Sequence, residues 1–343
     1  MTQPAKSITQ SPTRIIFLDF LRVFMCLSVV ALHVICAETD NIPQSDWSPR
    51  LKIERILVET FFRLSVPVFI TITGSLLLRK ERELSWKKLK TKITHMLLVI
   101  ITFGLAYCLI ESYLNGARGL LLLTESILNL MQGKSWAVMW YVYMLIGLYA
   151  ITPIIKAYTD KATQKEYRIT LIVLFVISSL IPTINTLTGL HFTQFYLQGL
   201  LYIFYYMLGQ YLFRYSIPTK HILILMPIGL IGSAILNTFD GIAYELDRLS
   251  SVFMVLLVIS VYLLAKTANL KESKTVNFIA KYSFGIYLIH TFWLNVLNKG
   301  FGFYPSAMPV IIGEISVFIY AIIASILSCL VLYRLPIFKK ILK

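Results

Sequence analysis

Long apolar runs separated by short polar segments make up almost the whole chain. Each run has roughly the 20 residues that a helix needs to cross the hydrocarbon layer of a membrane. We count ten such runs and predict an all-α, polytopic membrane protein with about ten transmembrane helices, forming one membrane domain over residues 1–343. The runs cover residues 15–37, 54–78, 93–114, 136–155, 169–188, 195–213, 221–238, 250–265, 276–297 and 309–333. The segment 117–132 is too short and polar to span, and we expect an interfacial or re-entrant helix there.

Composition supports the membrane assignment and excludes an ordinary soluble globular protein. Hydrophobic residues make up 57% of the chain and charged residues only 14%, with a mean hydropathy of +0.73, whereas soluble domains carry about 25% charged residues. The net charge of +15 arises from basic clusters between apolar runs. This pattern is typical of charge-directed membrane orientation rather than of a nucleic-acid-binding surface. The expected partner is therefore the lipid bilayer, with no nucleic acid.

Lysine and arginine are distributed unevenly between the loops. When successive loops are assigned to alternate sides of the membrane, one side receives 23 of the 32 basic residues, including those at both ends of the chain. Cytoplasmic loops of membrane proteins carry such an excess. The sequence therefore predicts that both termini are cytoplasmic.

The first apolar run contains three ionisable residues, Asp19, Arg22 and His33. Each such residue costs at least about 2.5–3.5 kcal/mol at the bilayer centre unless it is paired or faces water. Arg22 and His33 are nearly three helical turns apart, so both project from one face, about 16 Å apart along the axis. Asp19 lies one turn from Arg22. An arginine and a histidine on one face of one helix have no obvious packing purpose, and this stripe favours a functional role.

Two further runs carry polar faces. The second run places Glu59 and Arg63 four residues apart, as an internally compensated pair, and Pro67 removes a backbone hydrogen bond from the same run. The ninth run places Tyr287 and His290 on one face. The most economical arrangement of these polar faces surrounds a shared interior cavity.

Each of these residues also has a purely structural interpretation. His290 can act as a hydrogen-bond donor in helix packing, and Glu59 with Arg63 can form an ion pair that locks two helices together. Trp140 and Tyr141, with the tyrosines that follow them, can form the aromatic belt of a membrane interface. The four cysteines lie in or beside apolar runs without metal-ligand spacing. We therefore expect them to be core residues, and we expect no metal site.

The arginine and histidine of the first run are separated by ten residues, Arg22 to His33 in LDFLRVFMCLSVVALH. This spacing resembles the first-helix signature of the membrane-bound acyltransferase 3 superfamily. The segments FFRLSVPVFITITGSLLL, MWYVYMLIGLYAITPII, YIFYYMLGQYLF and SFGIYLIHTFWL are similar to later segments of that family, so the resemblance covers essentially the whole chain. It extends to the branch containing the enterobacterial common antigen O-acetyltransferase. That branch often has a histidine where this chain has Val138, which leaves the role of that histidine unfilled.

The resemblance implies a multi-pass protein of the bacterial cytoplasmic (inner) membrane. Such a protein transfers an acyl group, usually acetyl, from cytoplasmic acyl-CoA to a hydroxyl of a cell-surface or lipid-linked glycan at the outer face. A hydroxyl acceptor needs a general base, and neutral imidazole suits that role near pH 7. His33 is the candidate, either as the base or as a transient acyl-imidazole. The sequence does not choose between these two routes.

The other candidate residues take their roles from the same reaction. Two carboxylates join His33 as expected catalytic residues, namely Asp19 and Glu59. CoA is polyanionic and needs cations, for which the candidates are Arg22, Arg63, Lys87 and Lys88. The expected substrate-binding residues are Trp140, Tyr141, Tyr287 and His290. The last two, with Arg63, are interchangeable candidates for donating hydrogen bonds to the developing oxyanion.

A polysaccharide or small-molecule transporter or exporter is the main alternative, because such proteins also combine many helices with buried charges. They tend to contain paired repeats with helices interrupted in corresponding positions, whereas the charged helices here are concentrated at the start of the chain. A membrane sensory or binding module on the same fold is a third interpretation. Consumption of acyl-CoA separates the enzyme from both. The sequence leaves open the acceptor, the acyl chain length and the oligomeric state. A homo-oligomer is one possible state.

Overall fold

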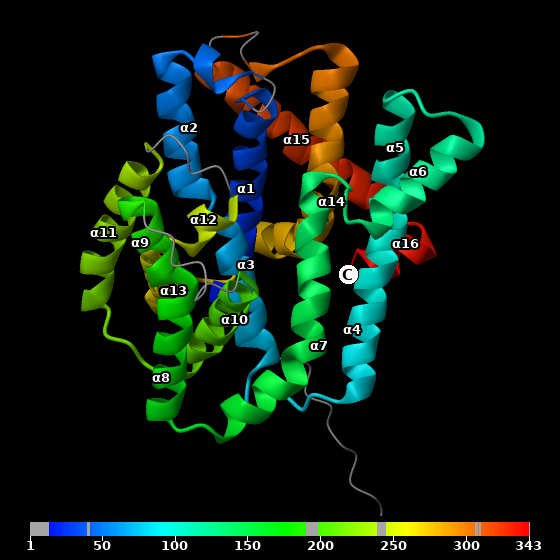
Figure 1. Ribbon diagram of the computed structural model, residues 1–343. Coiled ribbons are helices and arrows are strands. Elements are labelled where there is room, and N and C mark those ends of the chain that lie inside the picture. The colour runs from blue at the N-terminus through cyan, green and yellow to red at the C-terminus, as the bar shows by residue number, and fades with distance from the viewer. Residues whose placement is uncertain are drawn as a thin grey trace, which may run out of the picture.

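Every regular element described by the computed structural model is a helix (Figure 1). The structure describes residues 14–39, 42–189, 198–238, 245–305, 308 and 310–342, and within them the all-α prediction is confirmed. The α-helices span Ile16–Thr39 (α1), Pro49–Phe62 (α2), Ser65–Leu77 (α3), Trp86–Val99 (α4), Leu105–Leu114 (α5), Gly119–Met131 (α6), Trp140–Lys161 (α7), Gln164–Phe175 (α8), Ile181–Thr188 (α9), Gln198–Arg214 (α10), Lys220–Leu236 (α11), Glu245–Ser250 (α12), Val252–Thr267 (α13), Lys274–Asn295 (α14), Val310–Leu332 (α15) and Pro336–Ile341 (α16).

Six helical stretches of the described chain are long and apolar enough to cross a membrane. They are Ile16–Ala37, Pro49–Leu77, Trp86–Leu114, Trp140–Lys161, Gln164–Thr188 and Ile312–Leu332, and they coincide with six of the predicted runs. The other four runs coincide with α10, α11, α13 and α14, although residues 195–197 of the first lie outside the described part. The chain is therefore a multi-pass membrane protein, while the count of about ten spans and the orientation of the termini stay predictions.

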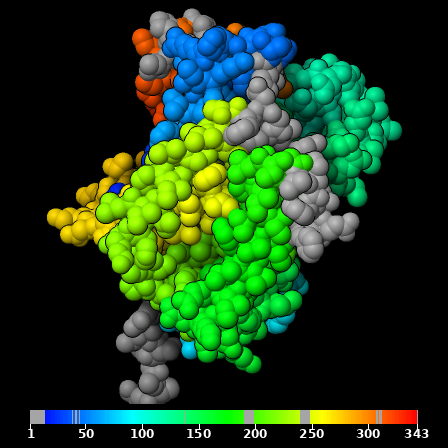
Figure 2. Space-filling model, turned by 60° about the vertical axis from the view of Figure 1, so that its left-hand side comes forward, coloured from blue at the N-terminus to red at the C-terminus, as the bar shows by residue number. Residues whose placement is uncertain are grey.

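The helices run between two ends of the molecule (Figure 1). We call one the basic end, where α3 leads into α4 through the Lys- and Arg-rich segment 79–92. At the other, the far end, α1 finishes, α2 begins and α5 turns back into α6. The hairpin of α5 and α6 projects from the side of the bundle, and α8 and α11 form much of the face seen in Figure 2.

The second predicted run, 54–78, consists of two helices rather than one. The first of them begins earlier, at Pro49, where the Ser48 side chain caps it by accepting a backbone hydrogen bond. The two are separated at Arg63, which lies between α2 and α3. Pro67 explains the break, because it has no amide hydrogen and its ring would clash with the Arg63 carbonyl in a continuous helix. The expected interruption thus occurs one turn before the proline.

Three of the long helices contain a π-helical turn, at Ile100–Gly104, Val176–Leu180 and Val296–Gly300. Such turns are rare and often occur at functional sites. The third continues α14 beyond the predicted run 276–297. It also carries Asn298, which is buried.

Helix α1 lies at the centre of the bundle. It packs against α2, α3, α13, α14 and α15, and residues such as Met25 and Val30 are completely buried. A central position suits a helix that carries ionisable residues, because in a membrane such residues face the bundle interior, where each finds a partner or a cavity. The pairing of α1 with α14 brings two polar faces together that are far apart in the sequence.

Helices α3 and α10 approach each other closely at two glycines. A Cβ atom on Gly74 would lie 1.8 Å from the backbone oxygen of Tyr206, and one on Gly209 would lie 1.9 Å from that of Thr71. The Ser75 hydroxyl donates a hydrogen bond across this contact to the Gly209 carbonyl at 2.8 Å. Small residues and short interhelical hydrogen bonds are what hold membrane helices together in the absence of a strong hydrophobic drive.

Candidate active site

The polar faces of α1 and α14 meet at a pair of histidines. His290 Nε2 lies 3.1 Å from His33 Nδ1, and the ring centroids are 5.0 Å apart. The His290 side chain is completely buried, whereas that of His33 is partly exposed. Two of the polar faces expected to share an interior site, those of α1 and α14, therefore meet, and the contact joins residues that are distant in the chain.

The hydrogen bonds of the two rings indicate where their protons lie. His290 Nδ1 is 3.0 Å from the Ile286 carbonyl, and His33 Nδ1 is 3.0 Å from the Val29 carbonyl. A carbonyl oxygen only accepts, so each Nδ1 carries a proton in the neutral pair, and His290 Nε2 is a second acceptor for the His33 proton. The lone pair of His33 is then on Nε2, the arrangement that a general base or a nucleophile requires.

A cavity of about 200 Å³ lies on the side of the histidines toward the basic end. Tyr141 and Tyr287 line it, with ring centroids 5.5 Å apart, and the Tyr287 ring is 6.2 Å from His290. The Tyr287 hydroxyl donates to the Val138 carbonyl at 2.5 Å. The structure thus brings two predicted substrate-binding residues to one cavity wall, and it gives Val138 a contact through its backbone rather than its side chain.

A second cavity, of about 480 Å³, opens at the basic end and shares Arg22 with the first. Asp19 also lines it and accepts a hydrogen bond from Arg22 Nη1 at 2.8 Å, while its other carboxylate oxygen contacts Arg14. Asp19 is about 21 Å from His33 along the helix axis. The structure therefore places Asp19 where it orients Arg22, at the other end of α1 from the histidine pair.

The cations of α4 are divided between solvent and the first cavity. Lys87 and Lys88 are exposed in the first turn and are not among the residues that line these cavities. Lys92, from the same basic segment, lines the first cavity and lies over the Tyr149 ring at 5.6 Å. Lys88 and Lys92 are four residues apart and lie on about the same face of the helix. Lys92 lines the cavity because it is one turn farther from the exposed first turn of α4.

A third cavity, of about 390 Å³, lies on the far-end side, and His33 lines it. Sequence reasoning did not single out its other residues, which include Glu111, Trp136, Thr291 and Asn298. One signal was present, because extending the Tyr287 and His290 stripe along the helical period leads to Asn298. Trp136 and Glu111 carried no such signal, since they approach from other helices.

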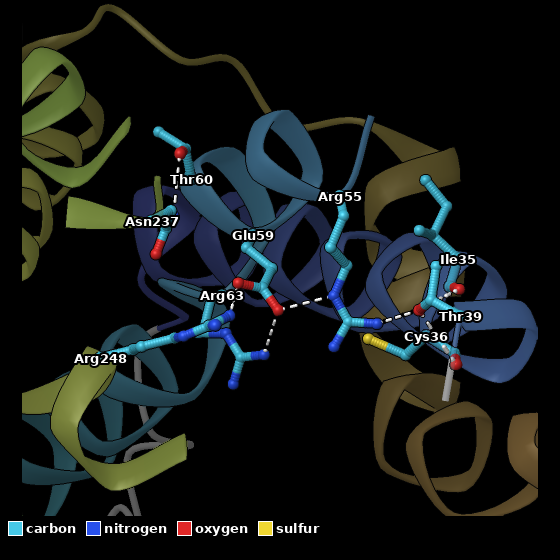
Figure 3. Close-up of polar contacts among 9 residues, drawn as sticks. All are labelled: Ile35, Cys36, Thr39, Arg55, Glu59, Thr60, Arg63, Asn237 and Arg248. Atoms are coloured by element: carbon cyan, nitrogen blue, oxygen red, sulfur yellow. Dashed lines mark hydrogen bonds and ion pairs between the residues drawn. The ribbon is translucent and has the colours of Figure 1, made fainter. Parts of the chain in front are cut away.

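Glu59 and Arg63 belong to a separate cluster (Figure 3). The Glu59 carboxylate is 2% exposed, and it receives Arg55 Nε at 2.7 Å and Arg63 Nη2 at 2.9 Å on one oxygen and Arg248 on the other. Arg55 also contacts Thr39 at the end of α1. None of these residues lines the three cavities above. The cluster ties α1, α2 and α12 together. Of the three candidate oxyanion donors, Arg63 therefore lies in this cluster, whereas His290 belongs to the histidine pair and the Tyr287 ring lies 6.2 Å from it.

The remaining candidate, Trp140, lies close to this site and is not among the residues that line the three cavities. The Trp140 ring centroid is 6.2 Å from that of Tyr141 and 6.0 Å from that of Tyr202, so Trp140 packs behind a cavity wall. The four cysteines are buried thiols. Within the residues that the structure describes, no group of three or more His, Cys, Asp or Glu side chains is placed to hold a metal ion.

Comparison with known proteins identifies the fold to which this site belongs. The family model of the acyltransferase 3 domain, described as an acyltransferase domain, matches residues 15–334. Neither a curated protein nor a solved structure matches the chain. The match covers nearly all of the described helices, and it includes the stripe on α1, the histidine pair and the three cavities. The chain therefore belongs to the acyltransferase 3 superfamily and is a membrane acyltransferase.

Proposed function

We propose that this protein is an O-acyltransferase, most simply an O-acetyltransferase, that uses acyl-CoA as donor and a hydroxyl of a cell-surface or lipid-linked glycan as acceptor. The observation that carries the proposal is the position of His33. This residue lines the far-end cavity, and its partner His290 lies 6.2 Å from the ring of Tyr287, which lines the cavity that shares Arg22 with the basic end. Donor and acceptor thus approach the histidine pair from opposite ends.

The basic end suits the donor. CoA carries phosphates, and guanidinium groups bind phosphate through paired hydrogen bonds. Arg22 is anchored by Asp19 between the two cavities at this end, and Lys92 adds a cation deeper in. The excess of basic residues at the same end is the basis for the proposal that it faces the cytoplasm of a bacterium, with both termini there and the far end outside the inner membrane.

The reaction needs one proton carrier and no metal in this proposal. In direct transfer, the acceptor hydroxyl gives its proton to His33 Nε2 and its oxygen attacks the thioester carbonyl. The carbon–sulfur bond then breaks, and the CoA thiolate takes the proton from the imidazolium. In the two-step route, His33 Nε2 attacks the carbonyl, the carbon–sulfur bond breaks, and CoA leaves as the thiolate while the acylated ring keeps its Nδ1 proton as an imidazolium. The acceptor oxygen then attacks the acyl carbon, the carbon–nitrogen bond breaks to restore neutral His33, and the hydroxyl proton neutralises the CoA thiolate. Both routes require neutral His33 to carry its proton on Nδ1 and its lone pair on Nε2.

The test is transfer of labelled acetyl from acetyl-CoA into surface glycan by membranes that contain the wild-type chain or His33→Ala at matched expression. Incorporation by the wild type alone would support both the reaction and its catalyst. Equal incorporation by the two would rule out His33. Absence of any His33-dependent consumption of acetyl-CoA would rule out the donor. An exporter, by contrast, would consume no acyl-CoA with either chain.

A further inference from the structure

The far-end cavity contains buried polar atoms that point to a ligand. We infer that this cavity is the acceptor subsite and binds a saccharide ring between Trp136 and the polar side chains of Thr291 and Asn298. The inference rests on the proposed function, since it locates the acceptor of that reaction. At about 390 Å³, the cavity falls in the range of small-molecule sites, which is about 300–1,000 Å³.

Two oxygen atoms in the wall lack hydrogen-bond partners. Asn298 is 5% exposed and its Oδ1 has no partner, and Thr291 is 8% exposed and its Oγ1 has none. Leaving a buried polar group unsatisfied is unfavourable, because the group has lost its hydrogen bonds to water and gained none in return. Two lining residues with such atoms are suited to a ligand that supplies both donors and acceptors once the side chains turn toward it, as the hydroxyls of a sugar do.

An aromatic wall of the same cavity is held rigidly. Trp136 stacks on Tyr107 with ring centroids 4.3 Å apart and an interplanar angle of 11°. The Trp136 indole donates to Glu111 Oε2 at 3.1 Å, and Lys299 Nζ lies 3.4 Å from the same oxygen. Tyr107 is itself fixed by donating to the Leu288 carbonyl at 2.6 Å. A fixed aromatic face offers a packing surface for the apolar C–H face of a pyranose at little cost in entropy.

The subsite is joined to the catalyst through both of its helices. His33 lines the cavity directly, and Thr291 follows His290 in the chain. The π-helical turn Val296–Gly300 places Asn298 on the same wall. A ring bound there presents its hydroxyls to the side of the histidine pair that is away from Arg22, which is where an acceptor must lie if the donor occupies the basic end.

The experiment measures saccharide binding directly. The full chain in lipid nanodiscs is titrated with methyl β-D-glucopyranoside, methyl β-D-galactopyranoside and methyl N-acetyl-β-D-glucosaminide, with cyclohexanol as a non-saccharide probe. Binding is followed by saturation-transfer NMR. The test variants are Asn298→Leu and Thr291→Val, which keep the shape and remove the oxygens. Ser325→Ala is the matched control, because its hydroxyl is also buried without a partner, but in α15 and outside the lining of this cavity.

We expect at least one pyranoside to bind the wild type and Ser325→Ala equally, and cyclohexanol to bind neither. Each test variant should raise the dissociation constant about tenfold, since a lost hydrogen bond of about 1.4 kcal/mol has that effect. The midpoint of thermal unfolding should stay the same or rise in all three variants, because each removes an unsatisfied buried group. A loss of binding caused by misfolding would instead lower it.

Absence of pyranoside binding by the wild type, or binding unaffected by both test variants, would overturn the subsite. Parallel measurement of acetyl-CoA consumption separates this failure from that of the proposed function. Consumption that depends on His33 without saccharide binding would reject only the subsite. Saccharide binding that depends on Asn298, without such consumption, would reject only the donor.

Discussion

Two groups of buried polar side chains are built in opposite ways in this bundle. The Glu59 cluster gathers three arginines around one carboxylate and lines none of the three cavities. The histidine pair has one direct contact between its rings; His33 lines the far-end cavity, and His290 lies 6.2 Å from the ring of Tyr287, which lines the first cavity. Both place polar groups inside a membrane protein, but of the two it is the histidine pair that contributes a lining residue, His33, to one of these three cavities.

The difference separates two reasons for keeping such residues in a membrane. An ion cluster recovers its desolvation cost through its own contacts, so its loss should affect stability first. A neutral histidine pair costs less to bury and its protons can move, so its loss should affect catalysis first. The variants below test whether stability and catalysis divide in this way.

The largest effect is expected from His33→Ala. General-base catalysis contributes about 10²–10⁴-fold, so acyl transfer should fall by at least that factor. Folding and CoA binding should be nearly unchanged, because the His33 side chain is partly exposed at a cavity wall and lies away from Arg22 and Lys92. Initial rates of labelled transfer, with CoA binding measured alongside, check this. An unfolded His33→Ala protein would place the histidine pair with the structural group instead.

Glu59→Ala should lower the free energy of unfolding by about 3–5 kcal/mol, because it leaves buried guanidinium groups without their shared carboxylate. Denaturant or thermal unfolding in nanodiscs measures this loss. Glu54→Ala is the matched control, since Glu54 pairs with Arg50 at 2.8 Å in the same helix but the arginine is 57% exposed. Exposed pairs are worth only about 0–1 kcal/mol. Similar losses in the two variants would contradict the structural role of the cluster.

His290→Leu should lower kcat about tenfold, which corresponds to about 1.4 kcal/mol of barrier, because His33 loses an acceptor that fixes its tautomer. His290→Gln should recover much of the rate, since its amide oxygen can accept from His33 Nδ1. The pH dependence of kcat should shift in the leucine variant only. If the leucine and glutamine variants had equal kcat values and the pH profile of the wild type, His290 would have only a packing role.

The smallest of these effects should come from Arg22→Ala, with a several-fold to tenfold rise in the KM for acetyl-CoA and little change in kcat, because a phosphate contact made equally in both states weakens binding alone. Lys87→Ala serves as its control and should change the same KM less than twofold, since Lys87 is exposed and lines neither cavity at the basic end. A larger rise in KM for Lys87→Ala than for Arg22→Ala would indicate that CoA binds at the exposed start of α4 instead of in the cavities.

Much of the fold could be predicted from local signals. Apolar runs of membrane length correspond to helices throughout the described chain, since burying a backbone in lipid demands internal hydrogen bonds. Boundaries were less predictable: the break between α2 and α3 falls before Pro67, and α14 runs on through a π-helical turn. Helix boundaries depend on steric contacts between neighbouring turns and on packing between helices, and hydropathy contains no information on either.

The candidate site divides along the same line. The sequence could identify four residues of the site, Arg22, His33, Tyr287 and His290, because helical spacing shows which residues share a face of one helix. The roles of Asp19, Glu59 and Arg63 could not be separated in this way, because an ion pair at helical spacing looks the same whether it lines a cavity or is enclosed by other helices. The structure places Asp19 at a cavity and Glu59 in a cluster with Arg248, which is distant in the chain.

By itself, the sequence determined that this chain is a helical membrane protein and that one helix carries an arginine and a histidine on a single face. Both follow from interactions between near neighbours in the chain and from the cost of exposing polar groups to lipid. Only the tertiary structure decided that His290 meets His33, and that Trp136, Thr291 and Asn298 surround one cavity. These contacts join separate helices, and their geometry is set by how the helices pack, which no local periodicity encodes.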